Sequence, residues 1–505
     1  MIQCVGTHTE KLVICDVGIY GINLCSMPSF PRTLADLKTG DGAMSSSQSF
    51  YGSLKELRRA TLSIPNRLRS ILKDAEFVQE VAAEYKLPLV ANERCGSWYI
   101  PSEMKVGSAY FKSTDGHMGQ WTLSLRRLNL SVLDTVGQHR GCIVVDSTRR
   151  GKVMPDAFSK TVPIWCAVIN RALFPEQRQL HHFQLPRLDL PASEISQIES
   201  RLDDFLRGFR DLGLDLAALR QRLGRPIRLQ WVIGHSTHTL SAYDSNVEER
   251  DTSCHNVILC SASRRVEGAE MSEAGYIQGA GDDSEGWSRG LTPQMFWRHK
   301  DMLLQAQEDE LPELIKELFL EEAIIRKPHD AVLIEPTKNL YIGSQTGFED
   351  ELDFDLVITC NNSEPDTQDG PKQLNVKCNS GKIGSRELRH KLHAVKSCAA
   401  SALERNPACR ILIICKTGKD LSVGVALMLL CLFYFCDGRC LYEAHGDDVS
   451  AMRGTTNIPS GFQQRQKVDK GFIRQRLAWI TSSVPAANPS RSTLQSINAY
   501  LMNRP

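Results

Sequence analysis

Residues 142–152 read CIVVDSTRRGK, a short β-branched apolar run that ends abruptly in a polar loop. This pattern is typical of a buried strand that opens into a functional loop. The loop carries two hydroxyls, two guanidinium groups, an ammonium group and a glycine that lets the backbone approach a ligand closely. Because ligands in α/β sheets sit beyond the carboxyl ends of strands, the stretch predicts an α/β fold that binds a phosphorylated ligand here.

The loop itself supplies the first set of predicted ligand-binding residues. They are Ser147, Thr148, Arg149, Arg150, Gly151 and Lys152. The single acid among these cations, Asp146, could hold a magnesium ion or orient a ribose hydroxyl. The alternative is an arginine-rich turn that only faces solvent.

Upstream, residues 111–117 (FKSTDGH) repeat the same chemistry with a cation, two hydroxyls, an acid, a glycine and a histidine. The alternative for the histidine is a loop residue satisfied by its neighbours. Residues 121–133 predict a helix that packs through its leucines and leaves Arg126 and Arg127 for solvent or ligand. Downstream, residues 159–161 predict a hydroxyl cap for a helix over 162–173, whose positive start beside Lys160 favours an anion.

Several long runs resemble one family, the initiator tRNA phosphoribosyl transferases. They are YFKSTDGHMGQW (110–121), SLRRLNL (124–130), CIVVDSTRRGK (142–152), MPDAFSKTVPIWCAVINRALF (154–174), YIQGAGDDSEGWSRGLTPQMFW (276–297) and LIICKTGKDLSVGVAL (412–427). The resemblance extends over most of the chain from about residue 50 onward.

The resemblance implies a reaction and two substrates. 5-Phosphoribosyl 1-pyrophosphate would donate its phosphoribosyl group to a ribose 2′-hydroxyl in the T-stem of initiator tRNA and release pyrophosphate. The product would be kept out of elongation. The resemblance also implies that Asn92, Arg94 and Gly96, which follow a predicted short strand, lie near the catalytic pocket.

This reaction needs cations on the leaving pyrophosphate, a stabilised oxocarbenium-like carbon and a base for the hydroxyl proton. We assign Arg149, Arg150, Lys152 and Mg²⁺ to the first. A carboxylate, Asp146 or Asp115, serves the second. His117 is the expected base, with Asp115 or Asp156 as competitors. The upstream binding residues are Lys112, Ser113 and Thr114.

Two further segments add predicted substrate contacts to the same sheet edge. An apolar run at 257–260 ends in hydroxyls and paired arginines, Arg264 and Arg265. The sequence GAGDD at 279–283 joins backbone freedom to Asp282 and Asp283, a combination suited to a metal-bound pyrophosphate.

The chain divides into a variable extension at 1–48, a candidate for disorder, a transferase domain at 49–326 and a phosphatase-like α/β domain at 327–505. A helical region over 53–85 carries a basic face that is either ordinary surface or faces RNA. Residues 193–223 predict an amphipathic helix, and residues 303–325 predict a strongly charged helix that forms the hinge between the two halves.

The last domain is similar to the dual-specificity phosphatases. Those enzymes need a cysteine thiolate and, six positions on, an arginine that clamps phosphate. Cys415 occupies the first position, but Leu421 occupies the second and cannot clamp phosphate. We therefore expect this loop to bind a phosphate without hydrolysing it, through its amides and through Cys415, Lys416, Gly418, Lys419 and Ser422. It either joins the donor site or holds a phosphate of the tRNA.

Composition constrains the partners and the compartment. The chain of 505 residues has 60 Lys+Arg and 59 Asp+Glu, so any tRNA contact must rest on local basic faces. Its 16 cysteines are scattered without CxxC pairs, which indicates reduced thiols and no zinc site. Cys431, Cys436 and Cys440 are read as core packing.

With no secretory signal and no apolar run that could span a membrane, we expect a soluble protein of the cytoplasm, with nuclear presence open. Oligomeric state is not encoded in any pattern we recognise.

We therefore predict a pentosyltransferase, as the resemblance implies. The alternative is a phosphatase-like module that binds a phosphorylated ligand or RNA. An active cysteine phosphatase is disfavoured because Leu421 replaces the phosphate clamp.

Overall fold

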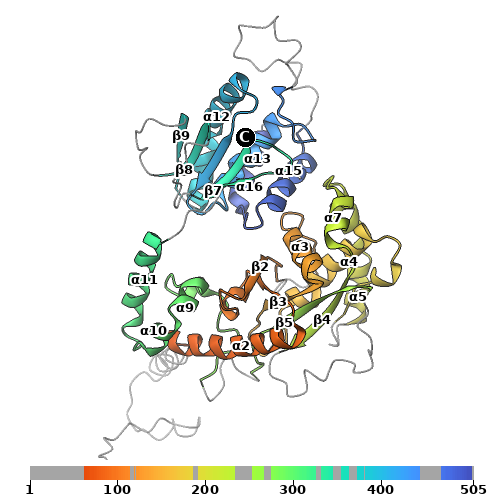
Figure 1. Ribbon diagram of the computed structural model, residues 1–505, viewed down its shortest axis with the longest axis vertical. Helices are drawn as coiled ribbons and strands as arrows, with labels where there is room; N and C mark the ends of the chain where they lie inside the picture. Colours follow the sequence, from red (N-terminus) through yellow and green to blue (C-terminus); the bar gives the residue numbers. More distant parts are fainter. Residues whose placement is uncertain are drawn as a thin grey trace, which may run out of the picture. The chain divides into compact units, whose positions relative to one another are not determined.

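The computed structural model describes residues 62–113, 119, 121–185, 191–233, 253–266, 275–325, 331–344, 354–362, 372–379, 381–443 and 468–502. The expected extension at 1–48 lies outside them. Within the described ranges the chain builds two mainly parallel sheets flanked by helices (Figure 1). This confirms the predicted α/β class.

The first sheet is parallel throughout and has the order β2-β1-β3-β5-β4. Its strands are β1 (Leu89–Asn92), β2 (Lys105–Ala109), β3 (Gly141–Asp146), β4 (Ile227–Ile233) and β5 (His255–Ser261). The central strand β3 is buried along its whole length. Its side chains alternate between two cores, so that Cys142 and Val144 enter one while Ile143 and Val145 enter the other.

Helices cover both faces of this sheet. The core that contains Val144 also takes residues from α3 (Leu130–His139), α4 (Val162–Leu173), α5 (Ala192–Glu199), α6 (Leu202–Arg210) and α7 (Leu216–Leu223). The core that contains Val145 takes residues from α2 (Ile64–Tyr85), α9 (Pro293–Arg298), α10 (Lys300–Gln305) and α11 (Leu311–Ile325). The short helix α8 (Ser284–Trp287) follows the predicted GAGDD loop. This is the layering of a doubly wound α/β fold.

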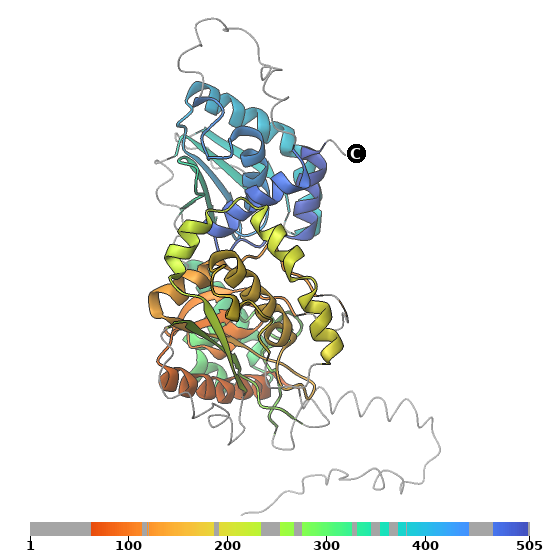
Figure 2. The ribbon, with the colours of Figure 1, turned by 90° about the vertical axis from the view of Figure 1, so that its right-hand side faces the viewer.

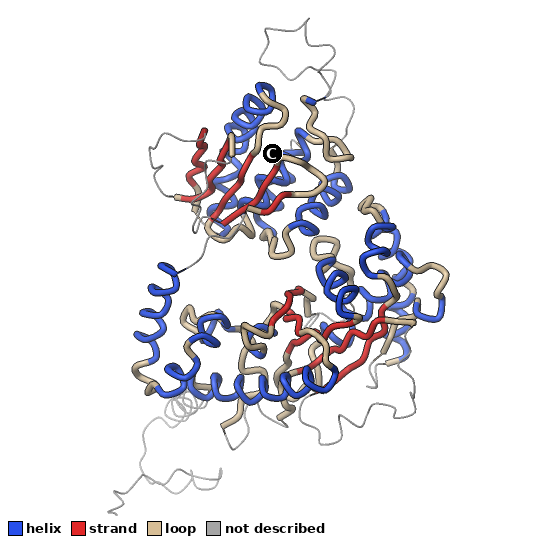
Figure 3. Tube along the Cα trace, in the orientation of Figure 1, coloured by secondary structure: helices blue, strands red, loops and turns tan. Residues whose placement is uncertain are grey.

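The second sheet has the order β6-β7-β10-β8-β9, with β6 antiparallel to β7 and the rest parallel. Figure 3 draws the strands of both sheets in red and the helices beside them in blue. Its strands are β6 (Val332–Leu333), β7 (Leu340–Ser344), β8 (Leu356–Asn361), β9 (Lys372–Lys377) and β10 (Ile411–Cys415). One large core joins it to α12 (Gly381–Arg405), α13 (Leu421–Phe433), α15 (Lys470–Ser483) and α16 (Arg491–Leu501). Figure 2 shows these helices in blue, grouped beside the strands. The helix α13 is buried almost all round, as its continuous apolar sequence predicts.

Four predicted elements need correction. No helix covers residues 121–129, because α3 begins only at Leu130, after Asn129 in the left-handed region (φ 53°). Residues 193–223 form three helices instead of one. The run 303–325 is interrupted, and α11 starts at Leu311, where Pro312 in its first turn fits a helix start but not a helix interior.

The fourth correction concerns the start of α4. A wide helical turn, η3 (Ala157–Thr161), runs directly into α4, and no side chain caps that helix. The Thr161 hydroxyl instead donates to the Lys112 carbonyl oxygen at 2.8 Å. Because the preceding turn supplies helical backbone, the expected hydroxyl cap and open anion-binding helix end are both wrong.

Among the helices of the described ranges, none has the length and apolar character needed to cross a membrane.

Candidate active site at the carboxyl ends of the first sheet

The predicted phosphate loop lies where the strand order of the first sheet reverses direction. From β1 the chain moves to the edge strand β2, and from β3 it moves to the opposite side, toward β4 and β5. The carboxyl ends of β1, β3 and β5 are therefore adjacent, at Asn92, Asp146 and Ser261. In open α/β sheets this reversal point forms the ligand crevice.

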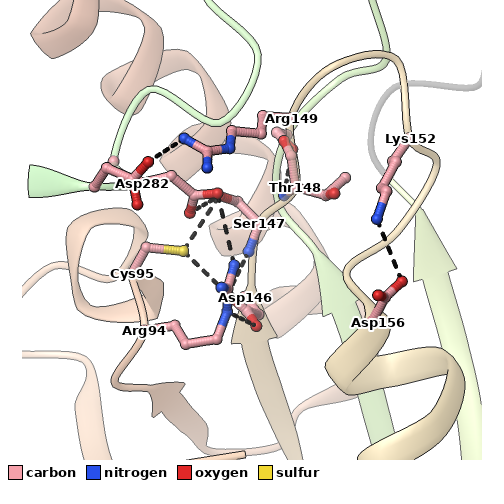
Figure 4. A network of polar contacts seen from close by, with 12 residues as sticks. Arg94, Cys95, Asp146, Ser147, Thr148, Arg149, Lys152, Asp156 and Asp282 are labelled. Atoms are coloured by element: carbon pink, nitrogen blue, oxygen red, sulfur yellow. Dashed lines mark hydrogen bonds and ion pairs between the residues drawn. The ribbon is translucent and has the colours of Figure 1, made fainter. Parts of the chain in front are cut away.

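Asp146 is the centre of a buried polar network (Figure 4). Its Oδ2 accepts hydrogen bonds from Asn92 Nδ2 at 2.7 Å and from Arg94 Nε at 3.3 Å. Its Oδ1 accepts from the Cys95 thiol at 3.0 Å and from the Ser147 amide at 2.8 Å. Four donors thus hold a carboxylate with no exposed surface, which ties the end of β3 to the segment that follows β1.

Arg94 links this carboxylate to a second one. Its Nη2 lies 3.6 Å from Asp282 Oδ2, in the GAGDD loop, while its Nε bonds Asp146. Burial raises the pKa of Asp282; the charge of Arg94 opposes this, and the nearby Asp146 adds to it. Burial alone would lower the pKa of Arg94, but Asp146 and its neighbours raise it, so the guanidinium stays charged.

Cys95 acts in this network as a hydrogen-bond donor. Burial, together with the charges of Asp282 and Asp146, raises the pKa of its thiol well above the ordinary value. A protonated thiol is what the contact to Asp146 Oδ1 requires.

Ser147 and Thr148, predicted to bind the ligand, are engaged inside the protein. The Ser147 hydroxyl lies 3.0 Å from the Tyr99 hydroxyl and 3.3 Å from Asp282 Oδ1. The Thr148 amide donates to Ser263 Oγ at 3.1 Å, and that hydroxyl donates to the Thr148 carbonyl at 2.8 Å. In this structure both residues fix the loop on its neighbours.

The following residues form the exposed part of the loop. Arg149 is half-buried and forms an ion pair with Asp283, so two predicted loops meet here. Arg150 (φ 57°) and Gly151 (φ 71°) both take the left-handed region, which turns the chain sharply. Lys152 Nζ lies 3.5 Å from Asp156 Oδ1.

The loop after β5 packs against the same turn, as expected. Arg265 Nε donates to the Gly151 carbonyl at 2.9 Å, and the Gly151 amide donates to Gln278 Oε1 at 2.9 Å. Arg264 stacks on the ring of Tyr276 at 4.7 Å. Three basic or acidic loops from distant parts of the sequence therefore converge on one edge of the sheet.

Other predicted residues lie apart from this cluster or outside the described residues. Lys160 pairs with Glu194 at 2.9 Å. Lys112 is exposed, and Ser113 is half-buried. Thr114, Asp115 and His117 fall outside the described residues, so the identity of the base stays a prediction.

Sequence reasoning missed several members of the network. Cys95 lies just before η2 (Gly96–Tyr99), and Tyr99 is its last residue. Ser263 and Gln278 hold the loop after β3 through hydrogen bonds. The resemblance pointed to the segment at 92–96, but only the parallel pairing of β1 with β3 brings it to Asp146.

The phosphatase-like loop follows β10 at the carboxyl edge of the second sheet. Cys415 is 3% exposed, and its Sγ lies 3.1 Å from Ser422 Oγ. Burial alone would raise the pKa of this thiol, but hydrogen bonds from the Ser422 hydroxyl and from three loop amides lower it below its usual value. Leu421 is 5% exposed and belongs to the core, so it makes no clamp for a phosphate.

The rest of this loop is held tightly. Gly418 has a φ of 67°, and a Cβ atom there would lie 3.0 Å from the Gly343 carbonyl oxygen. The Asp420 carboxylate accepts from the Ser490 amide at 2.8 Å and from Thr493 Oγ1 at 2.6 Å. Lys416 and Lys419 are exposed.

Two family descriptions match the chain. Residues 57–320 match the Rit1 N-terminal domain, and residues 372–501 match the Rit1 DUSP-like domain. An uncharacterized protein of Schizosaccharomyces pombe is 37% identical over 453 residues, which cover 87% of this chain and 94% of that protein. The tRNA A64-2′-O-ribosylphosphate transferase of Saccharomyces cerevisiae is 32% identical over 505 aligned residues, covering 89% of this chain and 94% of that protein.

Two solved phosphatase structures are similar to part of the chain. Human DUSP28 matches with a TM-score of 0.24 and 18% identity over 35% of this chain and 97% of its own. The Yvh1 phosphatase domain of Chaetomium thermophilum matches with a TM-score of 0.25 and 14% identity over 35% of this chain and 98% of its own.

Proposed function

The chain belongs to the Rit1 family, and from this premise we propose that it is a tRNA 2′-O-ribosylphosphate transferase, a pentosyltransferase. The donor is 5-phosphoribosyl 1-pyrophosphate, and the acceptor is a ribose 2′-hydroxyl in the T-stem of initiator tRNA. The modification marks this tRNA against use in elongation. The observation that supports the assignment best is the 32% identity to the Saccharomyces cerevisiae transferase over nearly the whole chain. Because the substrate is a tRNA of translation initiation, we place the enzyme in the cytoplasm.

The reaction exchanges one bond at the anomeric carbon of the donor for another. The bond from this carbon to the pyrophosphate oxygen breaks, and the electron pair leaves with pyrophosphate. The 2′-oxygen of the acceptor forms the new bond and loses its proton to a base. The protein must therefore stabilise negative charge on the leaving group and positive charge on the sugar.

The converging loops at the carboxyl ends of β3 and β5 suit the leaving group. The turn after β3 carries three cations, Arg149, Arg150 and Lys152, and Arg265 adds a fourth by bonding to the Gly151 carbonyl. Hydrogen bonds to Gln278 and Ser263 fix the backbone of this turn. A fixed donor set stabilises developing charge without reorganisation during the reaction. The buried Asp146 contributes a negative charge close behind the turn, and its four hydrogen bonds make its main role the positioning of the loop.

Proton removal is assigned to the segment before β3 or to the start of η3. His117 and Asp115 remain our first candidates from the sequence. Asp156 is the described candidate, and its carboxylate sits 3.5 Å from Lys152 Nζ.

The acidic residues of the GAGDD loop fit a magnesium ion that arrives with the donor. Across the parts of the chain that the structure describes, no cluster of three or more His, Cys, Asp or Glu side chains could hold a metal alone. Mg²⁺ usually needs only one or two carboxylates in addition to phosphate oxygens and water. Asp283, whose side chain is 70% exposed, meets that need, whereas Asp282 is buried beside Arg94. When bound, Mg²⁺ would neutralise charge on the pyrophosphate.

A second candidate function is a phosphatase-like module that binds a phosphorylated ligand or RNA without chemistry. The lowered pKa of Cys415 and the amides around it favour an anion-binding loop, while the buried Leu421 argues against hydrolysis.

One assay separates these functions. The protein is incubated with labelled donor and Mg²⁺ plus initiator or elongator tRNA, and separately with an aryl phosphate. The transferase predicts label in initiator tRNA alone. Binding of tRNA without label transfer would favour the second function, and aryl phosphate hydrolysis that Cys415→Ser abolishes would mean an active phosphatase.

A further inference from the structure

A basic cavity of about 860 Å³ lies apart from the converging loops. Its lining includes Tyr110, Arg126, Arg127, Gly418 and Lys419, but none of residues 146–152. It therefore brings together two sets of predicted binding residues that are distant in sequence and separates them from the proposed donor loop.

The charge of this lining is unbalanced. Among the described residues that line the cavity, four are basic (Lys105, Arg126, Arg127 and Lys419) and one is acidic, Glu93. Glu93 already pairs with Lys105 at 2.7 Å. Burial alone would raise the pKa of Glu93, but the charge of Lys105 and the hydrogen bonds from its partners outweigh burial and lower this pKa. The acid is thus used internally, and the described lining offers no further carboxylate to the other three cations.

The segment that carries two of these cations is fixed by packing. Trp121 Nε1 donates to Glu194 Oε1 at 2.9 Å, the Arg201 guanidinium covers the Trp121 ring at 5.0 Å, and Leu128 is buried. Because both ends of the segment are anchored, its backbone holds Arg126 and Arg127 in the lining of the cavity.

The two arginines are held close to one another. The Arg127 guanidinium stacks on the Tyr110 ring at 3.5 Å from its centroid and donates to Asn488 Oδ1. Burial, the neighbouring Arg127 and then Arg491 lower the pKa of Arg126. Like charges held together raise the free energy of the empty protein, and a polyanion that binds between them relieves this repulsion.

We propose that this cavity binds the phosphodiester backbone of the tRNA acceptor, as a site separate from the donor loop. The inference rests on the proposed function and deepens it. The cations are spread along the lining on two distant segments, which suits successive phosphates of a strand better than one compact pyrophosphate. Contacts to phosphates of this kind set affinity and register but carry no sequence information.

Binding of fluorescently labelled initiator tRNA, measured by anisotropy between about 50 and 200 mM salt, tests this proposal. The variants are Arg126→Ala, Lys419→Ala and the double variant, with Arg126→Lys as the charge-preserving form. Lys382→Ala is the matched control, because Lys382 is an exposed lysine on α12 that does not line the cavity. The truncated side chains are all exposed, so the fold should persist.

For the double variant we expect a Kd at least about tenfold higher and a log–log salt slope smaller by roughly 0.7–0.9 for each lost phosphate contact. Arg126→Lys should keep the slope, and Lys382→Ala should match the wild type. An unchanged Kd and slope in the double variant would overturn the proposal. The proposal would also be overturned if the double variant, titrated separately with 5-phosphoribosyl 1-pyrophosphate, lost affinity for this donor while its tRNA binding stayed intact.

Failure here can be told from failure of the transferase assignment. If the wild type binds tRNA through these residues but transfers no label, the surface stands and the transferase function falls. If the wild type transfers label and the double variant binds tRNA as tightly as the wild type, the transferase function stands and the proposed tRNA surface falls.

Discussion

At the scale of single residues, Asp146 connects the first sheet to its loops. The carboxylate has no exposed surface and accepts four hydrogen bonds, one of them from a charged guanidinium. A buried group of this kind is costly to leave unpaired. Its substitution should therefore affect folding as well as activity.

We predict that Asp146→Asn lowers the free energy of unfolding by on the order of 3 kcal/mol, because Arg94 loses its charged partner and the new amide faces Asn92 Nδ2. Urea denaturation measures this. The control is Asp283→Asn, whose mostly exposed ion pair with Arg149 should contribute less than about 1 kcal/mol. Equal stabilities of the two variants would contradict the positioning role.

The arginines of the loop should act on the reaction instead. We predict that Arg149→Ala and Arg150→Ala each lower kcat/KM for the donor by at least about tenfold, since a lost charge-assisted hydrogen bond costs roughly 1.5–3 kcal/mol. Steady-state transfer to initiator tRNA measures it. Wild-type rates from both variants would refute the assignment of this loop to the pyrophosphate.

At the scale of elements, the strands and helices with one strong pattern were predictable from the sequence. β3 and α4 agree with their predicted ranges within a residue, because each is mainly apolar and bounded by polar residues. Residues 121–129 misled because Trp121, Leu123 and Leu125 recur every second position, and Asn129 in the left-handed region prevents a helix from crossing it. We interpreted these apolar residues as one face of a helix, but they recur because an extended segment packs through them.

The candidate site was only partly predictable, because some of its features are local in the sequence and others depend on strand pairing. The polar loops could be read locally, since each follows an apolar strand. The contacts of Asp146 could not be read in this way. Asn92, Arg94 and Cys95 reach it only because β1 pairs directly with β3, although β2 lies between these two strands in the sequence. No local pattern encodes that pairing.

The GAGDD loop offers a test at this scale. Gly279 has a φ of 67°, and a Cβ atom there would lie 2.7 Å from the Thr148 carbonyl oxygen. We predict that Gly279→Ala destabilises the fold by more than the roughly 1–2 kcal/mol of a left-handed non-glycine residue, and that it lowers transfer by displacing the loop.

Gly290→Ala is the matched control, because Gly290 also has a positive φ (96°) but no heavy atom within 4 Å of its Cβ position. Urea denaturation of both variants separates backbone strain from the clash. If both lose the same free energy, the close contact between the two loops is not important for stability.

At the scale of the whole chain, the second sheet has a core of its own. Its main cluster draws only on residues between Ile334 and Ile497, while the clusters of the first sheet draw on residues up to Leu318 and, beyond these, on Ala478. We predict that a fragment of residues 327–505 unfolds cooperatively in urea. A fragment without a cooperative transition would mean that the boundary at 326/327, which so far rests on the sequence, is misplaced.

The central claim is that the loop after β3 binds the activated sugar phosphate, while the Cys415 loop has lost the clamp needed for hydrolysis. A crystal structure of the full chain with 5-phosphoribosyl 1-pyrophosphate and Mg²⁺ tests it most directly. We predict pyrophosphate oxygens within hydrogen-bonding distance of Arg149, Arg150 or the Gly151 turn, near Asp283. A donor seated instead on the amides around Cys415, with the turn at Gly151 unengaged, would contradict the claim.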